Sequence, residues 1–195
     1  MSRKPVLSTL AWVGAILGGL VLGIISALGA VYITSQGSET EAGWRTWSGT
    51  ATADSSPYAQ AAVAFRGILS MKPSESRYYV LEEDETGEHL REGCTYRLTA
   101  GGQPARWWSL SLYSGGETFA DNTDDAHSVS AASVSPGPDG RYSILVGPER
   151  GESAAWISTN GAGEFLLMLR LYVPEDPEGF NPPAYKRVSC EGQAI

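Results

Sequence analysis

A short acidic stretch, DNTDDAH at residues 121–127, holds several side chains that could bind a metal ion. It supplies Asp121, Asp124, Asp125 and His127. Oxygen ligands this close together are suited to a hard cation such as Ca²⁺. The spacing, however, departs from the EF-hand pattern, which needs a glycine and a later glutamate at fixed positions. We therefore expect a solvated hairpin loop here, with no metal and no cofactor.

The other signatures of catalysis are weak. The chain has two histidines, His89 and His127, and it contains neither a G-x-S-x-G elbow nor an H-E-x-x-H motif. Nothing marks two carboxylates as an acid–base pair of the kind that glycosidases use. The sequence therefore favours a non-enzymatic role, and a hydrolase acting on envelope glycans or lipids stays open as an alternative.

Two neighbouring tryptophans suggest a recognition surface. In RWWSLSLY at 106–113, period-two alternation puts Trp107 and Tyr113 on the face opposite Trp108. In EFLLMLRLYV at 164–173, Arg170 and Tyr172 share one face, while the other is the expected core face and comprises Phe165, Leu167, Leu169, Leu171 and Val173. Trp107, Tyr113, Arg170 and Tyr172 are thus candidate ligand-binding residues, because rings stack on sugars and arginine holds carboxylates or phosphates. The alternative, which we favour, is an arginine stacked on a ring in a second small core.

The elements that position these residues are mostly strands. Turn signals separate eight short strand-like stretches, RYYVLEED, CTYRLTA, RWWSLSLY, HSVSAASV, RYSILVG, SAAWIS, EFLLMLRLYV and AYKRVSC. They predict a mainly β fold, a jelly-roll-like antiparallel β-sandwich. One helix is expected from Tyr58 to Leu69, capped by Ser55 or Ser56, and it is the candidate to cover the second face of strand 164–173. We also expect Trp44 and Trp47 to pack the start of the domain onto its body.

The N-terminal segment predicts that the protein is located in a membrane. Residues 6–34 contain no Asp, Glu, Lys, Arg or His, and an uncharged stretch of this length predicts a transmembrane helix. Arg3 and Lys4 precede it, so the positive-inside rule places residues 1–5 in the cytoplasm, 35–43 as a linker and 44–195 as an exported domain. The prediction is a single-pass protein of a bacterial inner membrane with a periplasmic domain. A cleaved signal peptide is the alternative and would export the same domain.

Small residues form a stripe in this segment at Ala15, Gly19, Gly23 and Ala27. Such stripes let two membrane helices approach closely, which would make the chain a self-associating homo-oligomer. The alternative is that glycine is simply frequent in membrane helices.

The charge of the chain limits its partners. Its formal net charge is -8, and after Arg3 and Lys4 there remain 12 basic against 22 acidic residues. A domain this acidic is unsuited to nucleic acid, whose binders present a basic surface. The expected partners are membrane lipid around the N-terminal helix and a glycan or envelope protein.

Two cysteines, Cys94 and Cys190, agree with export. An isolated pair in an oxidising compartment usually forms a disulfide, which would tie the last strand to an early one. Two buried thiols are the alternative.

The order of several motifs resembles the family known as domain of unknown function 1214. The matching stretches are GWRTW, SPYAQAAVAFRGI, FADN, DGRYSI and GEFLLMLRLYVPEDPEGFNPPAY. The resemblance implies a β-sandwich with a small helix and carries over no catalytic residue. Two motifs of the family are altered here, where Ala126-His127-Ser128 replaces an Asn-Arg-Tyr-Ser motif and AWIST retains only Trp156.

These observations predict a membrane-anchored, non-catalytic module that binds a ligand or partner through its β-sandwich. The alternatives are the hydrolase described above and a structural subunit that self-associates through the membrane helix.

Overall fold

The computed structural model describes residues 4–46, 55–65, 71–102, 105–115, 118–176 and 179–190. The elements in these ranges are α1 (Lys4–Ser35), β1 (Ser38–Glu39), β2 (Arg45–Thr46), α2 (Pro57–Phe65), β3 (Ser76–Leu81), β4 (Cys94–Ala100), β5 (Ala105–Ser114), β6 (Ser128–Ser130), β7 (Tyr142–Gly147), β8 (Trp156–Ser158), β9 (Phe165–Pro174) and β10 (Ala184–Cys190). The chain divides into two compact units, one of residues 1–36 with 50–70 and one of residues 37–49 with 71–195.

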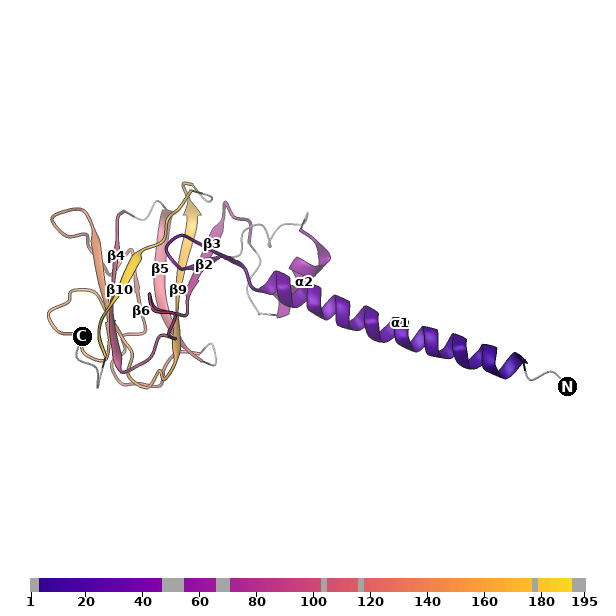
Figure 1. Ribbon diagram of the computed structural model, residues 1–195. Coiled ribbons are helices and arrows are strands. Elements are labelled where there is room, and N and C mark those ends of the chain that lie inside the picture. The colour runs from indigo at the N-terminus through magenta and orange to yellow at the C-terminus, as the bar shows by residue number, and fades with distance from the viewer. Residues whose placement is uncertain are drawn as a thin grey trace. The chain divides into compact units, whose positions relative to one another are not determined.

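The second unit is a β-sandwich. Its larger sheet has the strand order β1-β2-β3-β9-β5-β6, and its smaller sheet has the order β10-β4-β7-β8 (Figure 1). Neighbouring strands run antiparallel, except that β7 and β8 pair in parallel. The predicted mainly β sandwich is therefore confirmed, with one parallel pair that the antiparallel prediction did not include.

The core lies between the two sheets and follows the alternation of the sequence. Its inward side chains include Trp108, Leu110 and Leu112 of β5, Leu167, Leu169 and Leu171 of β9, Tyr96 and Leu98 of β4, and Ile144 and Val146 of β7, all of them buried. The expected core face of β9 is correct except at Val173, which is 51% exposed and has a φ of 49°. That left-handed backbone, unusual for a β-branched residue, breaks the alternation at the end of the strand.

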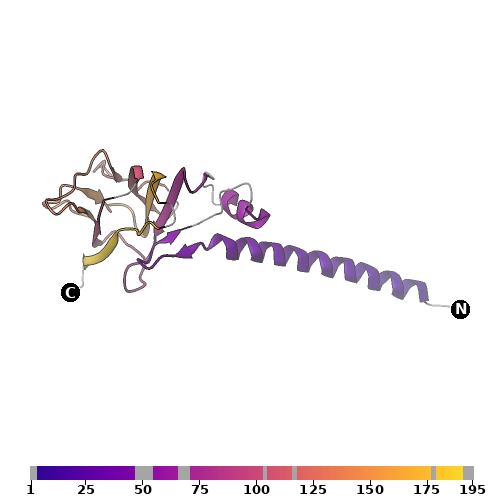
Figure 2. The ribbon, with the colours of Figure 1, turned by 90° about the horizontal axis from the view of Figure 1, so that it is seen from above.

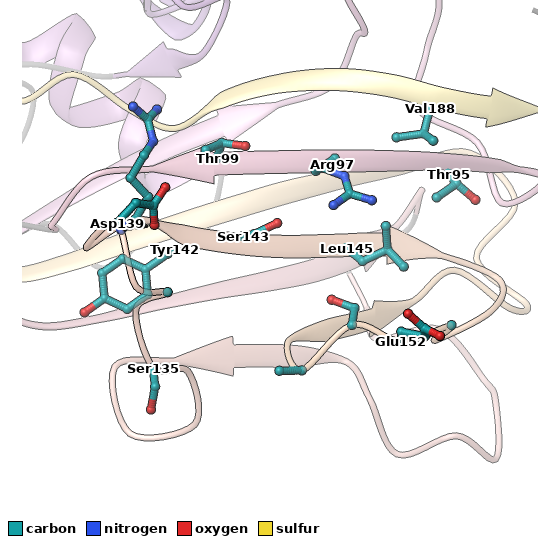
Figure 3. Close-up of a pocket in the computed structure, with 15 residues that line it drawn as sticks. Thr95, Arg97, Thr99, Ser135, Asp139, Tyr142, Ser143, Leu145, Glu152 and Val188 are labelled. Atoms are coloured by element: carbon teal, nitrogen blue, oxygen red, sulfur yellow. Dashed lines mark hydrogen bonds between the residues drawn. The ribbon is translucent and has the colours of Figure 1, made fainter.

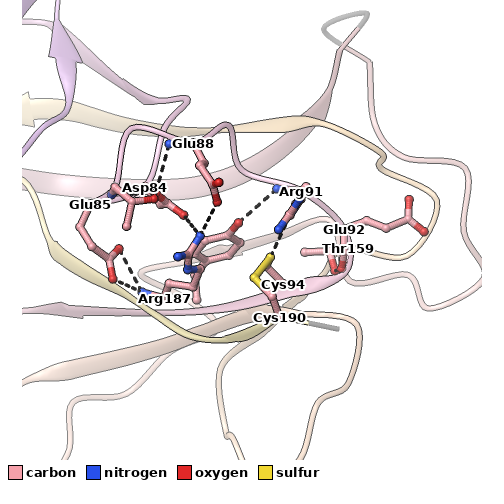
Figure 4. The surroundings of a disulfide bond; sticks show 11 residues. Asp84, Glu85, Glu88, Arg91, Glu92, Cys94, Thr159, Arg187 and Cys190 are labelled. Atoms are coloured by element: carbon pink, nitrogen blue, oxygen red, sulfur yellow. Dashed lines mark hydrogen bonds and ion pairs between the residues drawn. A yellow bond between two sulfur atoms is a disulfide. The ribbon is translucent and has the colours of Figure 1, made fainter. Parts of the chain in front are cut away.

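A disulfide joins Cys94, the first residue of β4, to Cys190, the last residue of β10 (Figure 4). The two cysteines are direct partners in the register of the two strands. The predicted pairing is thus confirmed, and it fastens the edge strand of the smaller sheet at the C-terminal end of that strand.

The β3–β4 connection also fastens β10. The buried carboxylate of Asp84 lies 2.8 Å from Nη1 of Arg187, and Glu88 lies 2.7 Å from the same nitrogen (Figure 4). The backbone N–H of Arg187 donates to both carboxylate oxygens of Glu85, at 3.0 and 3.2 Å. The register of β10 against β4 shifts between Arg187 and Ser189. One acidic turn therefore holds the middle of an edge strand.

Trp44 is fully buried in the core, and its indole N–H donates to the carbonyl of Pro183 at 2.8 Å. This confirms that the start of the domain packs onto its body. Trp47 lies outside the described residues.

The first unit contains the two helices. Residues Thr9–Ser35 of α1 are long and apolar enough to span a membrane, and the large apolar side chains of the helix are exposed. The short helix α2 lies beside the C-terminal end of α1 (Figure 2), and its Ala59 and Ala62 are buried. The predicted cap is present, since the hydroxyl of Ser56 accepts from the N–H of Ala59. The expectation that this helix covers the second face of β9 stays a prediction.

Candidate binding surface

The four predicted binding residues lie on one face of the larger sheet, the face directed away from the core. Trp107 of β5 is the direct strand partner of Tyr172 of β9, and Arg170 is the partner of Ser109. We call this surface the aromatic face and define it by Trp107, Tyr113, Arg170 and Tyr172 with the neighbouring Ser111. The alternation that buries the leucines of β5 and β9 also presents these side chains together.

One end of the aromatic face is open. The rings of Trp107 and Tyr172 have centroids 5.4 Å apart at an interplanar angle of 53°, a tilted contact. Trp107 is 40% exposed, although it is paired with Tyr172 in the sheet. This end offers a large apolar ring to a ligand or partner.

The other end is closed by its own hydrogen bonds. Nη2 of Arg170 donates to the hydroxyl of Tyr113 at 2.6 Å, and Nη1 donates to the hydroxyl of the buried Ser111 at 3.3 Å. The Arg170 guanidinium also lies over the Tyr113 ring, 5.3 Å from its centroid. This cation–π arrangement is the one that the packing interpretation of Arg170 predicts.

Two further residues extend the closed end. Phe119 stacks on Tyr113 with centroids 5.1 Å apart, and His127 lies 5.3 Å from Phe119. The buried Nδ1 of His127 has no hydrogen-bond partner among the described residues. Sequence reasoning named His127 only as a potential cation ligand and placed neither residue beside the aromatic face, because both lie in the loop between β5 and β6, where no periodic pattern shows the direction of a side chain.

The acidic loop is held by hydrogen bonds to β8 and the residues after it. Oδ2 of Asp124 accepts from the hydroxyl of Ser158 at 2.5 Å and from the side-chain amide of Asn160 at 2.8 Å. These hydrogen bonds lower the pKa of Asp124 below its usual value. Within the described ranges, no three His, Cys, Asp or Glu side chains are grouped as metal ligands. The Asp124 carboxylate thus connects the loop to the end of the smaller sheet.

The two positions where the sequence departs from the motifs of the family border the same hollow. A depression of about 260 Å³ is lined by Ala126 and Ser128 of the first stretch and by Ala155 and the retained Trp156 of the second. The indole N–H of Trp156 donates to the carbonyl of Gly147 at 2.9 Å, which fixes its ring. Both stretches therefore border a single region of the surface.

The small-residue stripe lies within α1, where an added Cβ at Gly19 or Gly23 would meet nothing within 4 Å. Ala15 and Ala27 belong to the same helix. Self-association through this stripe stays a prediction.

Comparison with known proteins identifies relatives of the sandwich. Residues 75–176, more than half of the chain, match the family described as "Protein of unknown function (DUF1214)". The VPA0106 protein from Vibrio parahaemolyticus has a solved structure with a TM-score of 0.60 and 20% identity, covering 70% of this chain and 36% of that one. An uncharacterised protein from Burkholderia cenocepacia has a TM-score of 0.47 and 13% identity, covering 100% of this chain and 46% of that one. The chain thus spans less than half the length of either structure, and the likeness to the Vibrio protein concerns the fold. Comparison with curated proteins found no match.

Proposed function

Since the chain belongs to the DUF1214 family, whose function is unknown, we propose from its own geometry that it is a membrane-anchored binding module. In this proposal α1 crosses a bacterial inner membrane once, and the sandwich lies in the periplasm. There it binds a glycan or an envelope protein without catalysing a reaction.

The open end of the aromatic face is the observation that carries the binding role. A tryptophan that is 40% exposed and in contact with a tyrosine ring contributes little to the core behind it. Tryptophan and tyrosine dominate the binding energy of protein surfaces, because they bury large areas with few rotatable bonds. The Trp107–Tyr172 pair is therefore the part of this surface best suited to recognition.

Three features support the proposed location. The large apolar side chains of α1 are exposed on every side, and lipid is the environment that would bury them. Arg3 and Lys4 precede the apolar run, which favours a cytoplasmic N-terminus. The Cys94–Cys190 disulfide is typical of a domain that folds in an oxidising compartment.

Site-specific photocrosslinking in intact cells tests the proposal. A photoreactive residue replaces Trp107 in the full-length chain, and the matched control replaces Lys186, which is exposed on β10 of the other sheet. We expect a discrete adduct at position 107 that is absent at position 186. Membrane fractionation and protease protection of spheroplasts locate the domain in the same cells. Equal adducts at both positions would contradict the binding surface, and a protease-resistant domain would contradict the location.

A further inference from the structure

The smaller sheet has a trough on the face directed away from the core, with a volume of about 700 Å³. Its floor is formed by outward residues of β4 and β7, and its walls are the loop between β6 and β7 and the loop between β7 and β8 (Figure 3). The volume lies within the range of roughly 300–1,000 Å³ that is typical of small-molecule sites. We propose that this trough is an oligosaccharide site that selects a sugar bearing a carboxylate.

The floor is rich in polar groups that have no partner among the described residues. Arg97 lies between Thr95 and Thr99 on β4, and Ser143 is the register partner of Thr99 on β7 (Figure 3). The three hydroxyls and the Arg97 guanidinium make no hydrogen bond to any other described residue. Four neighbouring groups that can donate hydrogen bonds are thus available to one ligand.

The floor also has an apolar component of the kind that sugar rings require. The Leu145 side chain lies opposite Arg97, and the Thr95 methyl group and Val188 add further apolar surface. Gly147 leaves room for Thr95, since a Cβ at Gly147 would lie 2.8 Å from the Thr95 hydroxyl. Alternating hydroxyl and methyl groups match a carbohydrate, which presents hydroxyls at its rim and C–H groups on its faces.

Arg97 determines the expected class of sugar. A guanidinium holds a carboxylate through two parallel hydrogen bonds, and Arg97 lies at the centre of the floor without an ion-pair partner in the described part of the chain. A carboxylate on the ligand would satisfy this charge, while the flanking hydroxyls would bond to the hydroxyls of the same sugar.

The walls make a densely charged polyanion a poor ligand. The walls also carry an exposed cation, Arg141. Asp139 and Glu152 are exposed carboxylates on the two wall loops. They can accept hydrogen bonds from sugar hydroxyls, and they would repel closely spaced phosphates. A sparsely charged glycan fits this arrangement better than a polyphosphate does.

This inference rests on the proposed location, because a periplasmic domain is exposed to envelope glycans. Binding by the purified chain does not depend on location, so the two ideas can fail separately. Full-length protein in detergent micelles is titrated calorimetrically with tetragalacturonate, tetramannuronate, a hyaluronate tetrasaccharide and sialyllactose. Cellotetraose and maltotetraose are the neutral probes, and tetrapolyphosphate is the anionic one. We expect at least one acidic sugar to bind about tenfold or more tightly than either neutral sugar and than tetrapolyphosphate.

Substitutions connect the binding to the trough. Arg97→Gln should lower the affinity for the acidic sugar by about tenfold or more, because it removes a charge-assisted pair of hydrogen bonds. Arg97→Lys should recover only part of that loss. The matched control, Arg106→Gln, alters an exposed arginine outside the trough and should bind as the wild type does. The proposal is overturned if no acidic sugar binds, if neutral sugars or polyphosphate bind equally well, or if Arg97→Gln leaves the affinity unchanged.

Discussion

The outward faces of the two sheets differ in how their central arginine side chains are bonded. On the larger sheet, Arg170 is bonded to Tyr113 and Ser111 and covered by ring contacts. On the smaller sheet, Arg97 lies in an open trough beside hydroxyls that have no described partner. Each face carries an arginine at the centre of a long strand, and the two arginines differ in what satisfies them.

The comparison shows how a structural arginine can be told from one available to a ligand. Polar groups whose bonds close within the protein rigidify their surroundings, since each partner fixes the next. Polar groups left open to water cost little when free and bond to a ligand on contact. Arg97, which has no partner among the described residues, is therefore a better marker of a polar ligand site in this fold than Arg170, which is bonded to Tyr113 and Ser111.

The disulfide should have the largest effect on stability, and it tests whether the smaller sheet depends on its edge strand. Replacing both Cys94 and Cys190 by serine should lower the free energy of unfolding by about 4–5 kcal/mol, because the bond closes a loop of 96 residues in the unfolded chain. Urea denaturation followed by tryptophan fluorescence measures this change. A loss below about 1 kcal/mol would show that β10 is held by its other contacts.

The adjacent tryptophans of β5 allow the stability contribution of the core side of the larger sheet to be compared with that of its outward side. Trp108→Ala should cost about 3–5 kcal/mol, because Trp108 is buried in the core. Trp107→Ala should cost about 1 kcal/mol or less, since its side chain is partly exposed. Denaturation of the two variants under identical conditions gives both values. Similar costs would mean that Trp107 is part of a second core and would weaken its assignment to recognition.

The β3–β4 connection belongs to neither outward face, and Asp84 tests how much its contact with β10 stabilises the domain. Burial alone would raise the pKa of Asp84, but hydrogen bonds from Thr86 and Glu88 and the charge of Arg187 lower it below 3.8 overall. A carboxylate with a lowered folded pKa stabilises the protein fully above its unfolded pKa, and this contribution disappears as the pH falls through the folded pKa. Asp84→Asn should therefore cost about 2 kcal/mol at pH 7.

The difference between the wild type and Asp84→Asn should narrow as the pH falls below about 4. Urea denaturation at a series of pH values from 7 to 2 measures this convergence. A constant difference over the whole series would show that the charge of Asp84 does not contribute.

The two arginines should give the smallest effects, and they address the comparison directly. Arg170→Ala should cost about 1.5–2 kcal/mol, because it removes two charge-assisted hydrogen bonds and leaves the buried Ser111 hydroxyl without its donor. Arg97→Ala should change stability by no more than about 0.5 kcal/mol. Thermal unfolding of both variants measures the difference. Equal costs would remove the distinction between the two faces.

Much of the fold could be predicted from alternation and turn signals. The buried leucines of β5 and β9 fall at every second position, so the core side of each strand follows from the sequence. The alternation failed at Val173, where the backbone takes a left-handed conformation that no residue pattern announced. The parallel pairing of β8 with β7 was equally hidden, because β8 has only three residues and a strand that short has no readable period.

The sites were only partly predictable for a physical reason. The sequence identified the aromatic face because its members lie on two regular strands. It did not place Phe119 and His127 beside this face, because their positions depend on a loop. The trough was missed entirely, because Arg97 and Thr99 are ordinary outward residues until the two loops enclose them. Concavity arises from the path of the chain between strands, and side-chain alternation does not encode it.

The hydrogen bonds from the backbone N–H of Arg187 to the Glu85 carboxylate affect how copies of this chain can associate. An unprotected edge strand offers its main-chain donors to a foreign strand, which is the first step of edge-to-edge aggregation. Here one donor is already occupied, and the adjacent bulge and the charges of Lys186 and Arg187 disturb the line of donors on either side. At high local concentration, copies of this chain would meet often, and this blocked edge would keep their sheets from pairing into fibrils.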